Sequence, residues 1–158
     1  MSDSVRCTID IEVRYVETDQ MGVVHHSNYL AWFELARTAL CRQGGRGYHE
    51  IEQDGHWLMV TAAQLRYRGG ARYGDVVKIE CWIDDLKSRT LTFAYRVRRG
   101  DELLVSGTTD HVWVEAGTKR LCRIPEALRP HFERMAGRSA ARTVAQSAAG
   151  EPSPNSAR

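Results

Sequence analysis

The chain has 158 residues, of which 42% are hydrophobic and 27% are charged, and its formal net charge is +2. These values are typical of one globular domain that can bury a core, and the small charge gives no indication of nucleic-acid binding. No apolar run approaches the roughly 20 residues of a membrane-spanning helix, and the opening residues lack the uninterrupted apolar run of a signal peptide. We therefore expect a cytoplasmic protein that does not insert into membranes.

The cysteines favour free thiols over a metal site. They are scattered along the chain without a CxxC pair or a zinc-ligand spacing, at Cys7, Cys41, Cys81 and Cys122. We predict that the protein holds no metal and needs no cofactor.

The first half of the chain changes period once. Residues 7–15 alternate apolar and polar side chains, which predicts a half-buried strand whose buried face closes at Tyr15. Residues 27–42 show the period of a helix, with Ser27 or Asn28 as N-cap and Arg37 on the polar half. A wide apolar face on this helix requires a sheet to cover it. This apolar face is formed by Tyr29, Trp32, Phe33, Leu35, Ala36, Ala39 and Leu40.

Four consecutive strands are predicted after this helix, at residues 58–67, 75–85, 89–99 and 103–115. The last is long, so we expect a bend or a bulge near Gly107. Trp82 and Trp113 stand on otherwise polar strand faces and suggest a partner there. A short helix follows within residues 123–135, with Pro125 near its start.

These elements predict an α+β fold, in which an antiparallel sheet wraps around one long central helix. We assign residues 1–136 to this single domain. Residues 137–158 are rich in Ala, Ser, Gly and Pro, and we expect them to form a disordered tail.

The connection between the first strand and the helix contains the sequence ETDQMGVVHHSNYL, residues 17–30. A lone loop carboxylate such as Asp19 is most often a turn or cap residue, but near a helix start it could also act as a base or nucleophile. Gly22 suits a turn or a close approach to a ligand. Amides at the helix start could bind an oxyanion. The adjacent His25 and His26 lack a third metal ligand at a sensible spacing.

The arginines of the segments RYRGGAR and RVRR are candidates for binding phosphates. For any one of them, a solvated strand edge is the favoured explanation.

The segment RYVETDQMGVVHHSNYLAWFELAR resembles the signature of the 4-hydroxybenzoyl-CoA thioesterase family, in particular its Tol-Pal-associated acyl-CoA thioesterase branch. The segments YRGGARYGDVVKIE and SGTTDHVWVEAGTKRLCRIPEALR resemble later parts of the same family. The resemblance implies a hot-dog fold and a homodimer with a continuous sheet, often paired into a homotetramer. It also implies active sites at the subunit interface.

The resemblance assigns the catalytic carboxylate to Asp19, as nucleophile or general base, and the oxyanion donor to the N–H of His26. Tyr15 and the His26 side chain match positions that assist in this branch. Glu17 departs from the family, which usually has Asp at this place.

The resemblance also implies the substrate-binding residues. Gly22, Val23, Val24 and Tyr29 would line the approach of the acyl thioester, and Arg66 and Arg68 are candidates for the nucleotide end of CoA.

The predicted activity is hydrolysis of an acyl-CoA to a free acid and CoA, with CoA present only as part of the substrate. One alternative is a thioesterase that acts on an acyl group held by a carrier protein. The other is a non-catalytic hot-dog module that binds acyl-CoA, against which the intact Asp19 argues.

Overall fold

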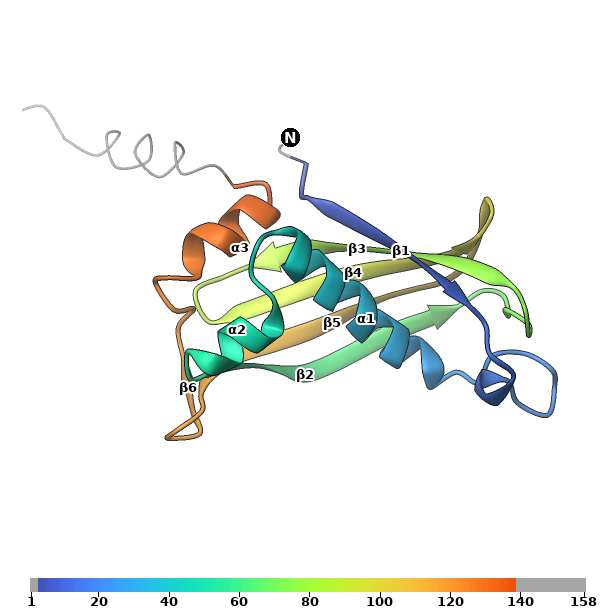
Figure 1. Cartoon of the computed structure of the whole chain (residues 1–158), viewed down its shortest axis with the longest axis horizontal. Helices are drawn as coiled ribbons and strands as arrows, with labels where there is room; N and C mark the ends of the chain where they lie inside the picture. Colours follow the sequence, from blue (N-terminus) through green and yellow to red (C-terminus); the bar gives the residue numbers. More distant parts are fainter. Residues whose placement is uncertain (1–2, 139–158) are drawn as a thin grey trace, which may run out of the picture.

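A computed structural model describes residues 3–138 of the chain. One antiparallel sheet has a long helix, α1 (Asn28–Gln43), lying across one of its faces (Figure 1). The sheet order is β1-β3-β4-β5-β2, with the short β6 paired to β5. This confirms the predicted α+β arrangement. The strands are β1 (Arg6–Glu12), β2 (His56–Tyr67), β3 (Val76–Leu86), β4 (Thr90–Arg99), β5 (Glu102–Glu115) and β6 (Arg120–Cys122).

Three short elements complete the described chain: a 3-10 turn η1 (Tyr15–Glu17), α2 (Tyr48–Gln53) and α3 (Arg129–Met135). The sequence did not predict α2 or β6, because elements of six and three residues are too short to show a period. The C-terminal helix was predicted, but it begins after Pro125, with Pro130 in its first turn. Most of the predicted disordered tail, residues 139–158, lies outside the described residues.

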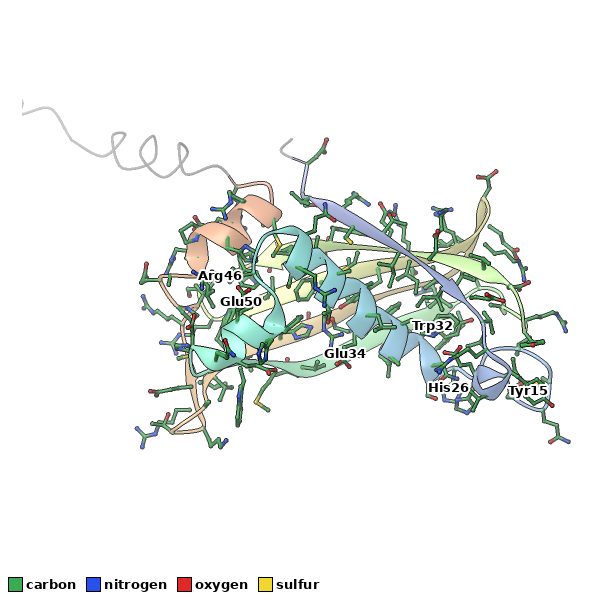
Figure 2. All side chains as sticks on the ribbon, in the orientation of Figure 1. Tyr15, His26, Trp32, Glu34, Arg46 and Glu50 are labelled. Carbon is green, nitrogen blue, oxygen red and sulfur yellow. The ribbon has the colours of Figure 1, made fainter. Side chains whose placement is uncertain are left out.

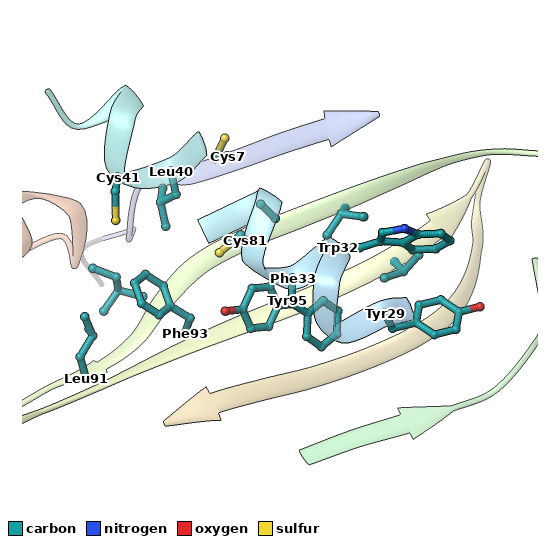
Figure 3. Packing of buried hydrophobic residues seen from close by; sticks show 14 of the residues in the cluster. Cys7, Tyr29, Trp32, Phe33, Leu40, Cys41, Cys81, Leu91, Phe93 and Tyr95 are labelled. Atoms are coloured by element: carbon teal, nitrogen blue, oxygen red, sulfur yellow. The ribbon is translucent and has the colours of Figure 1, made fainter. Parts of the chain in front are cut away.

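Helix α1 packs on the sheet through aromatic side chains (Figure 3). The Phe33 ring stacks on Tyr95 of β4, with ring centroids 4.1 Å apart and an interplanar angle of 1°. Gly107 of β5 lies against the same Phe33 ring, where a β-carbon would come within 2.9 Å of it. The absence of a side chain at Gly107 therefore allows the helix to approach the sheet closely.

The irregularity predicted near Gly107 lies a few residues before it. Gly107 itself keeps a regular register with Tyr95, and the shift between β4 and β5 falls at Val97/Arg98, where β5 passes from Val105 to Leu103. A second shift, between Val60 and Ala62, interrupts the pairing of β2 with β5. Gly107 serves the packing of the helix rather than the curvature of the strand.

The two tryptophans expected on polar faces lie in different surroundings. Trp113 is fully buried and packs edge-on against Phe132 of α3, with centroids 5.2 Å apart, so its suggested exposure to a partner was wrong. Trp82 is half-buried on the opposite face, where the guanidinium groups of Arg6 and Arg96 lie 4.2 and 5.1 Å from its ring centroid. Such cation–π pairs cover the indole with the protein's own side chains.

Polar side chains share the interior between α1 and the sheet. Arg37, which was predicted on the polar half of the helix, is only 9% exposed. The Thr109 hydroxyl is 2.7 Å from the Tyr95 hydroxyl and 2.8 Å from Nε2 of the buried His111. Burial, reinforced by the positive charge of Arg37, lowers the pKa of His111 to about 4. His111 is therefore neutral in the folded protein at neutral pH.

We expect the free energy of unfolding to fall as the pH decreases from about 6.5 to about 4. The unfolded chain takes up a proton at His111 near its ordinary pKa of 6.5, whereas the folded chain does so only near 4. Acid therefore favours the unfolded state in this window, by up to roughly 3 kcal/mol, and the contribution is constant above it. Chemical denaturation at a series of pH values measures this dependence.

The matched variants are His111→Gln and, as a control on an exposed helix position, His49→Gln. The stability of His111→Gln should fall less steeply between pH 6.5 and 4 than that of the wild type and of His49→Gln. If the free energy of unfolding fell equally steeply with decreasing pH in all three proteins, the buried neutral state of His111 would be contradicted.

No helix among residues 3–138 is long and apolar enough to cross a membrane.

Candidate active site

The predicted first strand ends early. Its alternation of buried and exposed residues holds as far as the buried Val13, but Tyr15 is 77% exposed. The chain turns into η1 instead of continuing the strand, and the Tyr15 ring lies edge-on to Tyr73, with centroids 5.8 Å apart. The prediction that Tyr15 closes the buried face was therefore wrong.

Residues 18–26, here called the Asp19 loop, connect η1 to α1. A bridge between Thr18 and Val24 closes the loop, inside which the Asp19 N–H donates to the Val23 carbonyl (2.8 Å). The Asp19 carbonyl accepts the Gly22 N–H (2.9 Å), and Oδ1 of Asp19 accepts the Met21 N–H (2.8 Å). Gly22 has a φ of +78°, a conformation that favours glycine. Asp19 is thus a turn residue whose side chain is held in place.

Beside the Asp19 loop lies a hollow of about 400 Å³. Six of the predicted site residues line it: Asp19, Val23, Val24, His26, Tyr29 and Arg68. Gly22 supports the turn without lining the hollow, and Tyr15 and Arg66 do not line it either. Arg66 lies along a different hollow on the outer face of the sheet, beside Trp82 and Arg96. The structure therefore separates the two arginines that were predicted to act together.

Apart from Arg68, the opposite wall of the hollow was not predicted as a site. The residues that were missed there are Tyr67 at the end of β2 and Gly69 and Gly70, which follow Arg68. A β-carbon on Gly70 would come within 2.9 Å of Val23, so this glycine lets the two walls touch. Met21 also lines the hollow. The paired glycines directly after a predicted strand were the signal that could have identified this wall.

His26, which lines the hollow, directly precedes the N-cap of α1 and has an open backbone amide. Ser27 is the N-cap, as predicted, but its side chain makes no capping hydrogen bond to the helix. Instead, its hydroxyl lies 2.7 Å from Nδ1 of His25. Among residues 3–138, the N–H of His26 has no acceptor. An unpaired amide at a helix start can donate to an oxyanion.

The side chain of His26 is exposed. Its ring lies against that of His25, with centroids 4.2 Å apart, and edge-on to Tyr67 at 6.4 Å. The Tyr67 hydroxyl donates to the His26 carbonyl (3.1 Å). Figure 2 shows His26 and Tyr15 at the same end of the molecule, where α1 begins.

The phenols of the hollow remain neutral at neutral pH. Burial raises the pKa of both Tyr29 and Tyr67 above the ordinary value of 10. Within the described part of the chain, no group of three or more His, Cys, Asp or Glu side chains could hold a metal ion. The ionisable side chains among the lining residues are those of Asp19, His26, Arg68, Tyr29 and Tyr67.

Comparison with known proteins places the chain in a superfamily. Residues 13–132 match the thioesterase-like superfamily, and the chain belongs to that superfamily. The Bacillus subtilis protein YneP is 36% identical over 107 residues, which cover 67% of this chain and 78% of the relative. A Haemophilus influenzae protein named acyl-CoA thioesterase YbgC is 26% identical over 126 residues, which cover 79% of this chain and 93% of the relative.

Solved structures of similar proteins share the fold of this chain. A hypothetical protein from Thermus thermophilus has a TM-score of 0.78 at 39% identity, covering 83% of this chain and 98% of that one. The DHNA-CoA thioesterase from Staphylococcus aureus has a TM-score of 0.77 at 26% identity, covering 94% and 97%. The predicted hot-dog fold and the predicted enzyme class, a thioester hydrolase, are confirmed.

We expect Gly22→Ala to destabilise the protein by about 1 kcal/mol or somewhat more, because the positive φ penalises any residue with a β-carbon. The matched control is Gly117→Ala, at a turn glycine with open space around it and without a positive φ. Thermal unfolding of the three proteins tests the prediction. If Gly22→Ala lost no stability, or no more than Gly117→Ala, the turn of the Asp19 loop would tolerate a side chain.

Proposed function

We propose that the protein is an acyl-CoA thioesterase in which the Asp19 carboxylate and the His26 amide act on the thioester carbonyl from the two sides of the hollow. The observation that carries the proposal is the shared location of these two groups. Asp19 lies in the turn, the open His26 N–H lies at the helix start, and both residues line one hollow. A carbonyl between them would have a carboxylate beside its carbon and a donor beside its oxygen.

The reaction consumes one water for each thioester. Asp19 either attacks the carbonyl carbon, forming an anhydride that water then hydrolyses, or removes a proton from the attacking water. In both cases the carbonyl oxygen becomes negatively charged, and it accepts a hydrogen bond from the His26 N–H. The carbon–sulfur bond breaks, and CoA leaves as a thiol. The apolar side chains of Val23 and Val24 would face the acyl group.

Three further assignments rest on the resemblance. Tyr15 is proposed to assist, although in the single chain it lies outside the hollow. Arg68 lines the hollow and is the better placed arginine for the phosphates of CoA, whereas Arg66 would meet them only if the nucleotide crossed to the outer sheet face. We place the chain in the 4-hydroxybenzoyl-CoA thioesterase family, and in its Tol-Pal-associated branch, on the ETD and GVVHH motifs.

We also propose a homodimer, or a tetramer of two such dimers, in the cytoplasm. Strand β2 is an edge of the sheet, and its residues 59–64 are exposed. A free, exposed edge can pair with a second copy of the chain and so continue the sheet. All four cysteines are free thiols, which supports a reducing compartment.

The activity is tested with a panel of short, long and aromatic acyl-CoAs, with a thiol-reactive dye that reports the release of CoA. We expect release from at least one class, and an acyl-carrier-protein arm shows whether the acyl group can be delivered in another form. Absence of release from every acyl-CoA, with folded protein, would refute the proposal.

We expect Asp19→Asn to lower kcat at least about 100-fold, because the amide can neither attack nor accept the proton. The Met21 N–H can still donate to the Asn oxygen, so the melting temperature should change little. Asp101→Asn, at an exposed hairpin turn, is the matched control and should retain wild-type activity. Near wild-type turnover of Asp19→Asn would remove Asp19 from the mechanism.

Two substitutions at His26 separate its amide from its ring. His26→Ala keeps the N–H, so we expect less than about a tenfold change in kcat. His26→Pro lacks both the ring and the N–H, which has no acceptor among the described residues, and we expect kcat to fall about 100- to 1,000-fold. Melting temperatures check that both variants fold. An equally large fall of kcat in both variants would assign the role of His26 to its ring instead.

A further inference from the structure

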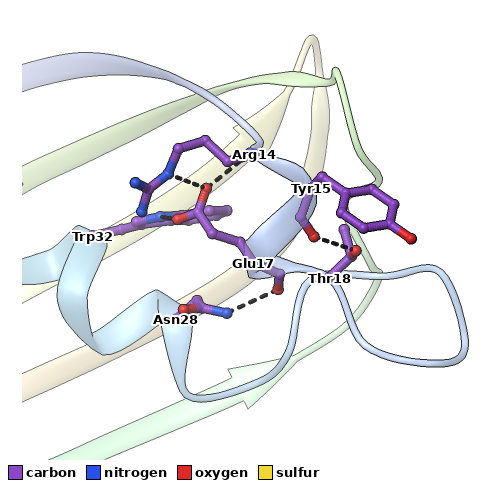
Figure 4. Close-up of polar contacts among 6 residues, drawn as sticks. All are labelled: Arg14, Tyr15, Glu17, Thr18, Asn28 and Trp32. Atoms are coloured by element: carbon purple, nitrogen blue, oxygen red, sulfur yellow. Dashed lines mark hydrogen bonds and ion pairs between the residues drawn. The ribbon is translucent and has the colours of Figure 1, made fainter.

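A buried carboxylate lies two residues before Asp19. Glu17 is only 5% exposed, and its carboxylate accepts three hydrogen bonds (Figure 4). Oε2 accepts the indole N–H of Trp32 from the buried face of α1 (2.7 Å). Oε1 accepts the backbone N–H of Arg14 (2.9 Å) and the Arg14 Nε–H (3.2 Å). One side chain thus joins the chain segment before η1 to the central helix.

The backbone of Glu17 joins the same segment to the exit of the Asp19 loop. Its carbonyl accepts the N–H of His25 (2.8 Å) and the side-chain amide of Asn28 in the first turn of α1 (2.8 Å). Both ends of the Asp19 loop are therefore fixed relative to α1 through Glu17. The His26 amide follows directly after His25, at one end of this arrangement.

The carboxylate of Glu17 is charged in this position. Burial opposes its ionisation, but the hydrogen bonds from the Arg14 backbone and the Trp32 indole outweigh burial, and the net effect lowers its pKa. A buried charge with several donors holds its geometry more tightly than a neutral group does, because each donor is aimed at it. The hydrogen bonds of this carboxylate therefore connect the start of η1, at Arg14, with Trp32 of α1.

We infer that Glu17 is a positioning residue that fixes the Asp19 carboxylate relative to the open His26 amide by tying both ends of the Asp19 loop to Trp32 and Asn28. This role rests on the proposed function, since it is the alignment of those two groups that Glu17 would maintain. Displacement of a catalytic group by about 1 Å can cost 100-fold in rate, so a residue that touches no substrate can still control kcat.

The length of the side chain matters for this role. Glu17 reaches both the Arg14 N–H and the Trp32 N–H with separate oxygens. An Asp at this place is one methylene shorter, so Glu17→Asp could satisfy one donor only by giving up the other. Glu17→Gln keeps the length but presents an NH₂ group to one of the donors.

The test compares wild type, Glu17→Gln and Glu80→Gln. Glu80 pairs with Arg6 on the outer face of the sheet, so Glu80→Gln is a matched control for loss of a carboxylate. We expect Glu17→Gln to lower kcat at least about tenfold with less than about a threefold change in KM, and Glu80→Gln to change neither. Unchanged kcat in folded Glu17→Gln would overturn the inference.

A double variant distinguishes positioning from general destabilisation. If Glu17 acts by aligning Asp19, Glu17→Gln should add less than about a twofold loss when Asp19 is already Asn. Additive losses in the double variant would show that Glu17 acts independently of Asp19 and would overturn the inference. Wild-type turnover in Asp19→Asn alone would instead refute the proposed function.

An amide-exchange experiment supplies a readout that does not depend on activity. Hydrogen exchange followed by NMR should show faster exchange of the Asp19, Gly22 and His25 amides in Glu17→Gln, with the β4 and β5 amides unchanged. Unchanged exchange in the Asp19 loop would overturn the inference. Should Glu17→Gln fail to fold, Trp32→Phe removes one donor to the same carboxylate, and the same shifts in exchange and kcat are expected, with the same outcomes contradicting them.

Discussion

The fold depends on the burial of one face of α1 against a single antiparallel sheet. Phe33 lies flat on Tyr95 and against Gly107, where the missing side chain lets the helix approach. Because this contact fixes where the helix lies and in which direction it runs, it also fixes where its first turn emerges. The N–H of His26 therefore lies at the end of the sheet where the Asp19 loop arrives. The position of the active-site amide is a consequence of core packing.

The two explanations of Asp19 from sequence are compatible. Its carboxylate accepts the Met21 N–H, as a turn residue does, and it also lines the hollow beside the helix start. The turn hydrogen bond limits the motion of the side chain. A catalytic carboxylate benefits from this restriction, since the proposed reaction requires a fixed orientation.

Hydrophobic periodicity was sufficient to predict the central helix, the five longer strands and their assembly into one sheet. It failed where polar groups lie inside. The inner face of β5 carries Thr109 and His111, so the pattern hid that Trp113 points into the core. Arg37 is buried for a similar reason, beside the phenols of the interior. Side chains of this kind are buried only because specific partners surround them, and those partners come from distant parts of the sequence.

The site was predictable in part. Asp19, the valines and Arg68 were identified from sequence, but Tyr67, Gly69 and Gly70 were not, because they lie more than 40 residues from the Asp19 loop and their position depends on how β2 ends. The separation of Arg66 from Arg68 likewise follows from a strand path that no local pattern encodes. Glu17 could be noted from sequence as a departure from the family. Its buried contact with Trp32 could not, because it requires the relative placement of η1 and α1.

The central claim is that one carbonyl lies between the Asp19 carboxylate and the His26 amide. The most direct measurement is a structure of the complex with an acyl-CoA analogue in which a methylene group replaces the thioester sulfur and the carbonyl remains. The account predicts the carbonyl oxygen at about 2.7–3.1 Å from the His26 nitrogen, with an Asp19 oxygen facing the carbonyl carbon. An analogue bound with its carbonyl away from both groups would contradict it.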